Sequence, residues 1–213
     1  MQTIKGLCVL DVDGTLIEEE VIDLLGKEAD CEKEVTLLTA QAMSGKLDFE
    51  SSLRQRVSLL KRLSIDVFDK IYRELHLSKN AAQFVKTLQE NQIAVGLVSG
   101  GFTVIVERLA TDLGISLFTA NQLETRDGYL TGNLIGPVIS REVKEATLVR
   151  WAEELEVPFD RTIAIGDGAN DLAMLKRSGL AIAFCAKEIV NKNTSYHIEE
   201  RDFAKVLEKI NLL

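Results

Sequence analysis

Two aspartates stand one residue apart at the end of an apolar run, in the segment LCVLDVDGTL at residues 7–16. In an extended chain the side chains of Asp11 and Asp13 point to the same side, because side chains alternate with a period of two. Two carboxylates about 4 Å apart repel each other by about 4 kcal/mol at an effective dielectric of 20. A single Asp-x-Asp is most often a turn with solvated acids, so this pair gains meaning only if a cation offsets the repulsion.

A second group of acids follows a later apolar run, in the segment GDGAND at residues 166–171. The glycines beside Asp167 permit a tight turn and a close approach of the backbone. Asn170 and Asp171 fall in the first turn of the helix that we expect next, and capping that helix needs only one such side chain. If the two groups meet, their carboxylates form a site for a hard cation such as Mg²⁺, which is typically completed by substrate phosphate.

Two further segments carry groups that suit a phosphate. Ser99 is followed by Gly100 and Gly101 and then by a predicted helix, and small residues before a helix let backbone N–H groups approach an anion. An ordinary serine N-cap is the equal alternative. Lys144 lies at the start of another predicted helix, where the helix dipole disfavours a cation unless an anion lies nearby. Acids, Mg²⁺ and phosphate donors in one cleft would specify phosphoryl transfer.

The predicted elements place these groups at strand ends. Short, nearly continuous apolar runs predict strands buried on both faces, and amphipathic segments between them predict helices. This alternation is typical of an α/β fold with a doubly wound, Rossmann-like parallel sheet, which binds ligands at the carboxyl ends of its strands. The predicted strands are residues 6–11, 93–99, 116–121, 162–167 and 180–184, the predicted helices are 79–91, 103–113, 142–156 and 169–178, and an Asp-Gly within 125–132 predicts a hairpin.

Residues 16–77 interrupt this alternation, because they are helix-rich and carry no convincing strand and no proline. We expect them to form a helical cap inserted after the first strand. Residues 1–15 and 78–213 then make up the α/β catalytic core. A cap that closes over the strand ends would exclude water during phosphoryl transfer.

Two charged residues of the expected cap share a face with apolar ones. If residues 52–63 form a helix, Arg56 falls in the middle of its apolar arc. A snorkelling arginine can do that, but an arginine aimed inward can also bind a carboxylate with two hydrogen bonds. Glu20 shares a face with Ile17 and Leu24, so it could meet an ammonium group, and the alternative is that Glu20 and Arg56 pair with each other.

Composition and charge exclude several classes of function. The chain has 213 residues, 46% hydrophobic and 27% charged, and its net charge of −8 argues against a nucleic-acid or anionic-membrane partner. No apolar run approaches the roughly 18 residues of a membrane span, and the first residues lack signal-peptide features. Cys8, Cys31 and Cys185 suggest neither a metal site nor a disulfide framework, and His76 and His197 stand alone. A cytoplasmic protein with a small-molecule partner is expected, and its oligomeric state is left open.

Four motifs in order resemble the haloacid dehalogenase superfamily: DVDGT at residues 11–15, Ser99 after the second strand, Lys144, and GDGAND. Within that superfamily the chain is similar to the phosphoserine phosphatases over essentially its full length. The closer similarity rests on DVDGTLIEEE with Glu20, LDFESSLRQRVSLLK with Arg56, LVSGGF, and DGYLTGNLIGPV leading to Lys144. Gly14 is a departure, because phosphoserine phosphatases often have serine there, and it makes the first motif more general.

This resemblance implies a reaction, the Mg²⁺-dependent hydrolysis of O-phosphoserine to serine and phosphate, which is the last step of serine biosynthesis. Asp11 would be the nucleophile that forms an aspartyl-phosphate. Asp13 would be the general acid and then the general base, and a neighbouring carboxylate can raise its pKa for that role. The implied Mg²⁺ ligands are the Asp11 side chain, the Asp13 backbone carbonyl and Asp167, with Asp171 in support, and the implied substrate-binding residues are Glu20, Arg56, Ser99, Gly100, Lys144 and Asn170.

Two other functions are compatible with the same residues. Another small-molecule phosphatase of the superfamily, or a phosphoserine or homoserine phosphotransferase, would keep Asp11, Asp13, Ser99, Lys144 and Asp167 and use the cap differently. A non-enzymatic phospho-receiver module also uses a strand-end aspartate, Mg²⁺, a serine or threonine and a lysine. Asp13 and the long cap argue against the receiver, because a lasting phosphoryl mark needs neither an acid/base group nor a lid.

Overall fold

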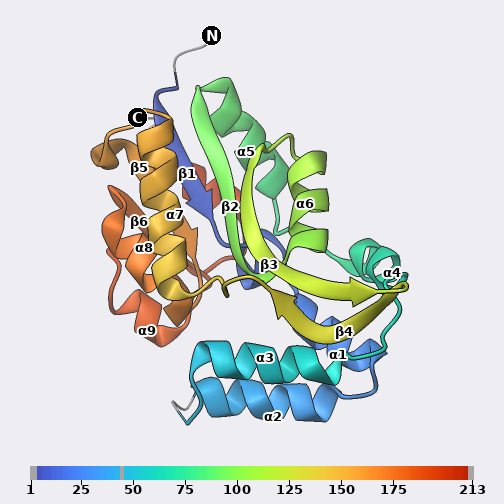
Figure 1. Ribbon diagram of the computed structural model, residues 1–213. Helices are drawn as coiled ribbons and strands as arrows, with labels where there is room; N and C mark the ends of the chain where they lie inside the picture. Colours follow the sequence, from blue (N-terminus) through green and yellow to red (C-terminus); the bar gives the residue numbers. More distant parts are fainter. Residues whose placement is uncertain (1–3, 44–45, 211–213) are drawn as a thin grey trace.

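One sheet runs through the part of the chain that the computed structural model describes, residues 4–43 and 46–210 (Figure 1). Its strand order is β4-β3-β2-β1-β5-β6-β7, and neighbouring strands are parallel except for the antiparallel pair β3 and β4. This order confirms the predicted α/β class. The strands are β1 (Gly6–Leu10), β2 (Ile93–Phe102), β3 (Leu117–Arg126), β4 (Tyr129–Ile135), β5 (Thr162–Gly166), β6 (Leu180–Phe184) and β7 (Tyr196–Ile198).

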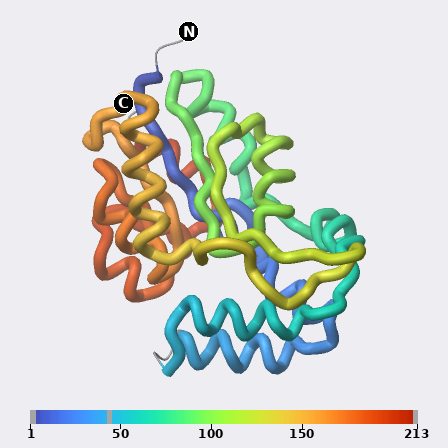
Figure 2. Tube along the Cα trace, viewed as in Figure 1, coloured from blue at the N-terminus to red at the C-terminus, as the bar shows by residue number. Residues whose placement is uncertain are grey.

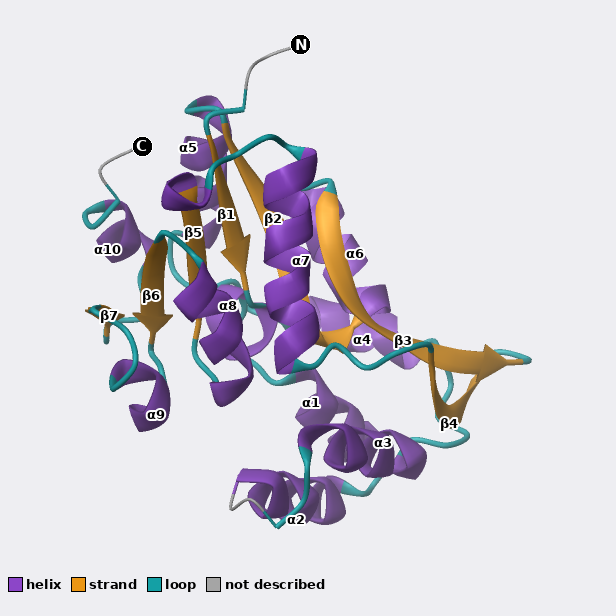
Figure 3. Ribbon diagram, turned by 60° about the vertical axis from the view of Figure 1, so that its left-hand side comes forward, coloured by secondary structure: helices purple, strands orange, loops and turns teal. Residues whose placement is uncertain are grey.

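The central strand β1 is buried on both faces because its sequence, GLCVL, is apolar throughout. Leu7 and Val9 pack into one hydrophobic layer, and Cys8 and Leu10 pack into the other. Helices therefore cover both faces of the sheet (Figure 3). The Leu7 layer holds α7 (Arg141–Glu154), α8 (Leu172–Arg177) and α9 (Glu188–Asn191), and the Cys8 layer holds α5 (Ala81–Glu90), α6 (Thr103–Asp112) and α10 (Phe203–Leu207).

A separate group of helices lies beyond the carboxyl ends of the strands (Figures 1 and 2). It comprises α1 (Val21–Glu28), α2 (Glu32–Met43), α3 (Phe49–Leu59) and α4 (Val67–Glu74). Two segments of backbone connect these helices to the core, one after β1 and one before α5, and they lie side by side. Ile17 forms an antiparallel bridge with Leu77, and the N–H of Glu18 donates to the carbonyl of His76 at 3.0 Å. The two connections to these helices are thus tied together.

The β3–β4 hairpin connects the sheet to the same helices. Its tip is Asp127-Gly128, where both residues have positive φ, and this confirms the predicted Asp-Gly turn. The hairpin pairs with the segment after α3, because Arg62 N–H donates to the Leu130 carbonyl at 2.8 Å and Leu130 N–H donates to the Leu63 carbonyl at 2.9 Å. Among the described helices, none has the length and apolar character needed to cross a membrane.

Some predicted boundaries were wrong for local reasons. The helix predicted over residues 52–63 is α3, which begins after Asp48, whose carboxylate accepts from Ser51 N–H at 2.9 Å, and ends at Leu59 before the chain joins the hairpin. The helix predicted over 169–178 begins as a 3₁₀ turn, Ala169–Asp171, and only then becomes α8. The short elements β7, α9 and α10 were not predicted, because each has too few residues to show a period.

Candidate active site

Three neighbouring strands bring the predicted site residues to one edge of the sheet. β2, β1 and β5 are adjacent in the sheet, Asp11 directly follows β1, Asp167 directly follows β5, and Ser99 lies near the end of β2. After Asp11 the chain makes a tight turn over Val12–Leu16, in which Gly14 has a φ of 71°. This left-handed conformation favours glycine, so the residue that departs from the phosphoserine phosphatase pattern fits its backbone.

Lys144 joins two of the acids in the interior. Its side chain is fully buried, and its Nζ donates to Asp11 Oδ1 at 2.5 Å and to Asp171 Oδ1 at 2.7 Å. Burial alone would lower the pKa of Lys144, but the two carboxylates outweigh it and raise that pKa above its ordinary value. Lys144 is therefore a permanent cation between Asp11 and Asp171. The carboxylates of Asp11 and Asp171 are the nearby anions that explain a lysine in the first turn of α7.

The acids outnumber the cations around them. Ligand oxygens of Asp11, Asp167 and Asp171 lie within 4.8 Å of one another. Burial raises the pKa of Asp11 well above its usual value, and the charge of Asp171 raises it further despite Lys144. Burial also raises the pKa of Asp167, against the lowering effect of Lys187, whose Nζ lies 3.6 Å from Asp167 Oδ2. This uncompensated negative charge on oxygen ligands fits a divalent cation of the hard class.

Asp13 is held in a different environment from Asp11. Its Oδ1 accepts from the backbone N–H of Val21 at 3.0 Å, and its Oδ2 accepts from the hydroxyl of Ser99 at 3.1 Å. The Ser99 hydroxyl in turn accepts from Gly101 N–H at 2.8 Å, which aims its proton at Asp13. A Cβ at residue 101 would overlap Asp13 Oδ2, so the second glycine of the pair makes room for this carboxyl. Burial raises the pKa of Asp13 despite these hydrogen bonds.

Arg56 is buried in α3, with 8% of its surface exposed. Among the described residues, its guanidinium donates long hydrogen bonds to the Ser52 carbonyl at 3.4 Å and to Thr39 Oγ1 at 3.3 Å. It has no ion pair within the described ranges, so the structure shows neither a snorkelling arginine nor a Glu20–Arg56 pair. Burial lowers the pKa of Arg56, and the charges of Glu20 and Asp23 oppose this.

Glu20 is more exposed than expected, and it precedes the first residue of α1. Partial burial of its carboxyl, with the charges of Asp13 and Asp167, raises its pKa to about 7. A Cβ at residue 14 would lie 3.6 Å from Glu20 Oε1 and 3.3 Å from Asp167 Oδ2. Glu20 therefore borders the acid cluster rather than standing apart from it.

Phe49, the first residue of α3, lies beside the loop that contains Ser99 and Gly100. A Cβ at residue 100 would lie 3.3 Å from the ring of Phe49 and 3.8 Å from Asn170 Nδ2. Gly100, Asn170 and Phe49 are thus neighbours, although they come from β2, the 3₁₀ turn before α8, and the helical group. The absence of a side chain at Gly100 leaves its backbone open to a ligand between these elements.

Asn121 is a polar residue of the site region that the sequence did not single out. It is 2% exposed, its Nδ2 donates to the Gly100 carbonyl at 2.8 Å, and its Oδ1 accepts from Ile139 N–H at 2.9 Å. Asn121 thereby ties the Ser99–Gly100 loop to the segment that leads to Lys144. An asparagine within the apolar strand SLFTAN was the available signal, because buried amides are nearly always hydrogen-bonded.

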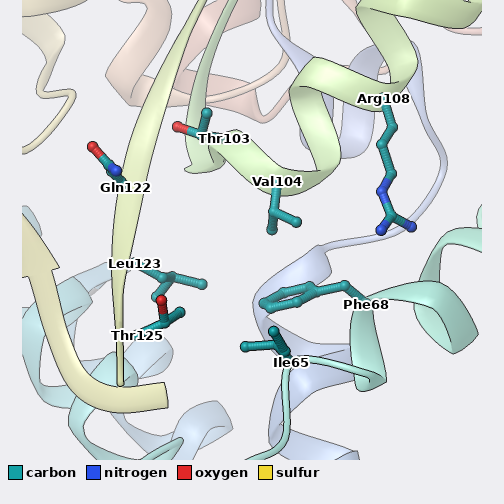
Figure 4. Close-up of a pocket in the computed structure, with 8 residues that line it drawn as sticks. All are labelled: Ile65, Phe68, Thr103, Val104, Arg108, Gln122, Leu123 and Thr125. Atoms are coloured by element: carbon teal, nitrogen blue, oxygen red, sulfur yellow. The ribbon is translucent and has the colours of Figure 1, made fainter. Parts of the chain in front are cut away.

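None of the residues that line the cavity drawn in Figure 4 belongs to the acid cluster. This cavity has a volume of about 280 Å³ and lies between α4 on one side and α6 and β3 on the other. The charge of Arg108 at its rim is already neutralised by Asp69, whose Oδ1 lies 2.7 Å from Arg108 Nη1. The residues that line it are Ile65, Phe68, Thr103, Val104, Arg108, Gln122, Leu123 and Thr125. This lining offers no carboxylate for a cation and no free positive charge for a phosphate, so the acid cluster is the candidate site.

Comparison with known proteins agrees with this geometry. The haloacid dehalogenase-like hydrolase family matches residues 8–176. The phosphoserine phosphatase of Streptococcus thermophilus is 49% identical over 208 residues, which cover 98% of this chain and 97% of that protein. The phosphoserine phosphatase of Methanocaldococcus jannaschii is 40% identical over 210 residues, which cover 99% of this chain and all of that protein.

Solved structures of other proteins have the same fold over nearly the whole of this chain. A substrate-bound phosphoserine phosphatase complex superposes with a TM-score of 0.93 at 40% identity, covering 99% of this chain and 100% of the other. A phospho-aspartyl intermediate analogue of phosphoserine phosphatase gives a TM-score of 0.92 at 40% identity, covering 98% of this chain and 100% of the other. The chain therefore belongs to the haloacid dehalogenase-like hydrolase family, beside these phosphoserine phosphatases.

Proposed function

We propose that this protein is a Mg²⁺-dependent phosphoserine phosphatase, which hydrolyses O-phosphoserine to serine and phosphate through an aspartyl-phosphate on Asp11. The observation that carries the proposal is the buried pairing of Asp11 with Lys144, beside a second carboxyl, Asp13, that is bonded to Ser99. The similarity to phosphoserine phosphatases over nearly the whole chain supports the choice of substrate.

In the first half of the reaction a carboxylate oxygen of Asp11 attacks phosphorus, and the bond from phosphorus to the serine oxygen breaks. Lys144 favours the ionised, nucleophilic form of Asp11, because its buried ammonium bonds directly to that carboxylate. Ser99, Gly100 and Lys144 bind the phosphoryl oxygens, and donors fixed before the reaction stabilise the charge that develops there. Asn170 is proposed to bind the same group from the opposite loop.

Asp13 performs the proton transfers. Because burial raises its pKa, it can carry a proton to the departing serine oxygen. The resulting carboxylate then takes a proton from the water that attacks the aspartyl-phosphate, which restores Asp11 and releases phosphate. The hydrogen bond from the Val21 N–H keeps this carboxyl oriented when the single proton of the Ser99 hydroxyl turns from Asp13 to the phosphoryl group.

Mg²⁺ would be held by the Asp11 side chain, the Asp13 backbone carbonyl and Asp167, with Asp171 in support. When bound, it would neutralise negative charge on the phosphoryl oxygens. We expect Mg²⁺ at about 100 times its Kd to stabilise the protein by about 2.7 kcal/mol, which raises Tm by roughly 5–10 °C for a domain of this size. Thermal unfolding with and without Mg²⁺ measures the effect.

The Asp167→Asn variant should lose most of this stabilisation, because it removes a charged ligand. Asp160→Asn is the matched control, since Asp160 is an exposed aspartate in the turn before β5. An equal rise in Tm for wild type and Asp167→Asn would contradict the proposed metal site.

We further propose that residues 16–77 act as a cap that reads the substrate's amino-acid part, with Arg56 for the carboxylate and Glu20 for the ammonium. The Arg56→Ala variant should raise KM for phosphoserine by about 10- to 100-fold, since a charge-assisted hydrogen bond contributes about 1.5–3 kcal/mol. KM for p-nitrophenyl phosphate, which has no carboxylate, should change little. Steady-state kinetics on both substrates measures the difference.

Arg54→Ala provides the control for Arg56, because Arg54 lies on the exposed side of the same helix and pairs with Glu50 at 2.7 Å. It should leave both KM values unchanged. Equal increases in KM for the two substrates in Arg56→Ala would refute the proposal that Arg56 binds the substrate carboxylate.

A phosphate-release assay with phosphoserine, phosphothreonine and sugar phosphates, with and without Mg²⁺, tests the proposed function. The proposal expects Mg²⁺-dependent turnover with phosphoserine as the best substrate. A sugar phosphate as the best substrate would favour another phosphatase of the family, and phosphoryl transfer to added alcohols in preference to water would favour a phosphotransferase.

We propose a cytoplasmic location, which the free thiols of Cys8, Cys31 and Cys185 support.

A further inference from the structure

A segment near the end of the chain lies against the catalytic turn. Arg201 Nη1 donates to the Gly14 carbonyl at 2.8 Å and lies 3.3 Å from Ser78 Oγ. Gly14 is the next residue after Asp13 and has a φ of 71° within the turn. Arg201 therefore bonds to the peptide unit between Gly14 and Thr15, one residue beyond the proposed acid/base residue and across 187 positions of sequence.

Two further carbonyls of the turn, those of Thr15 and Leu16, accept hydrogen bonds from Ser78. Ser78 Oγ donates to the Thr15 carbonyl at 2.7 Å, and Ser78 N–H donates to the Leu16 carbonyl at 2.9 Å. Three successive carbonyls of the turn thus accept from Arg201 or Ser78. The Thr15 hydroxyl is buried without a hydrogen-bond partner, so it supplies no tie of its own. The turn contains non-helical dihedral angles at Asp13 and Gly14, and a segment of this kind depends on outside donors for its shape.

The two residues that follow Arg201 are held in place by several contacts. The neighbouring Asp202 is 5% exposed and accepts from Asn80 Nδ2 at 2.7 Å, from Ala204 N–H at 2.9 Å, and from Lys79 Nζ at 2.7 Å. Phe203 is fully buried, and its ring stacks on Phe184 with centroids 4.5 Å apart. These contacts fix the backbone on the C-terminal side of Arg201, so its guanidinium is delivered to Gly14 at a set position.

We propose that Arg201 is a positioning residue for the reaction, which holds the Gly14 carbonyl and thereby sets the orientation of Asp13. A charged donor makes a shorter and stronger bond to a carbonyl than a neutral one does. Without it, the peptide unit between Gly14 and Thr15 can rotate, the turn at Gly14 changes shape, and the Asp13 carboxyl moves relative to the leaving oxygen. This inference rests on the proposed function, because it assigns Asp13 the proton transfers.

The test compares Arg201→Ala, Arg201→Lys and the control Lys205→Ala, which removes a cation of α10 whose Nζ lies 3.1 Å from the exposed carboxylate of Glu208. Hydrogen–deuterium exchange of the peptide covering residues 11–16 should accelerate in Arg201→Ala and return toward wild type in Arg201→Lys. A misplaced acid should lower kcat/KM for phosphoserine by about 10- to 100-fold. It should lower kcat/KM less for p-nitrophenyl phosphate, whose leaving group needs no proton.

Unchanged exchange in residues 11–16, or an equal loss of kcat/KM on both substrates, would overturn the role of Arg201. Lys205→Ala should resemble wild type in both measurements. Failure of the proposed function gives a different result, a wild-type protein that releases no phosphate from phosphoserine. The exchange measurement still decides in that case whether Arg201 holds the turn.

Discussion

Replacing Asp11 with asparagine is expected to lower kcat for phosphoserine by about 10⁴-fold or more, the order seen when a covalent nucleophile is removed. A carboxamide is not a nucleophile toward phosphorus, so no aspartyl-phosphate forms. The change keeps the shape of the side chain and leaves Lys144 its bond to Asp171 at 2.7 Å. Phosphoserine should therefore still bind, and isothermal titration of the variant checks this separately from turnover.

The Asp160→Asn variant controls for a general effect of losing one carboxylate, and it should keep wild-type kcat. Turnover by Asp11→Asn at more than a few per cent of the wild-type rate would rule out Asp11 as the nucleophile. Loss of phosphoserine binding in Asp11→Asn would show instead that the substitution disrupts the site as a whole.

The Lys144→Met variant should lose both activity and stability. Lys144 is fully buried, and Asp11 and Asp171 depend on it for compensation. Removing one partner from a buried ionic group costs about 3–5 kcal/mol, because charge is left unpaired in the interior. Loss of a fixed donor to the phosphoryl group should lower kcat by about 10²- to 10³-fold. Chemical denaturation and steady-state kinetics measure the two effects.

The stability loss in Lys144→Met should depend on pH in a defined direction. Burial raises the pKa of Asp11, and without the opposing effect of Lys144 its carboxyl binds a proton still more tightly in the folded than in the unfolded state. The deficit relative to wild type should therefore shrink as the pH falls toward the raised pKa of Asp11. Lys192→Met is the control, since Lys192 is exposed and its Nζ lies 2.5 Å from the exposed carboxylate of Glu188. A full deficit at every pH would contradict an electrostatic origin.

The core of the fold could be predicted because its strands are buried on both faces. Strands such as β1 and β5 are nearly continuous apolar runs, and their order along the chain, separated by amphipathic helices, restricts the sheet to few topologies. The hairpin tip followed from Asp127-Gly128, which the turn requires. By contrast, the pairing of the hairpin with residues 62–65 follows from a long-range meeting of backbones that carries no local pattern.

The acids of the site could be predicted because like charges at strand ends are costly unless something compensates them. Lys144 was recognisable because a cation is unfavourable in the first turn of a helix. Asn121 and Arg201 were not, because their role comes from hydrogen bonds to the carbonyls of Gly100 and Gly14. Backbone carbonyls are the same at every residue, so sequence alone does not show which of them a distant side chain binds.

The most direct test of the account is to locate the phosphoryl group during turnover. Wild-type protein would be mixed with phosphoserine labelled in its phosphate and with Mg²⁺, quenched in acid within the first turnovers, digested and mapped. An acid-stable, alkali-labile label is expected on the peptide that contains Asp11, and no label is expected on that peptide in Asp11→Asn. Phosphate release with no trapped label under these conditions, or a label on another residue, would contradict an aspartyl-phosphate on Asp11.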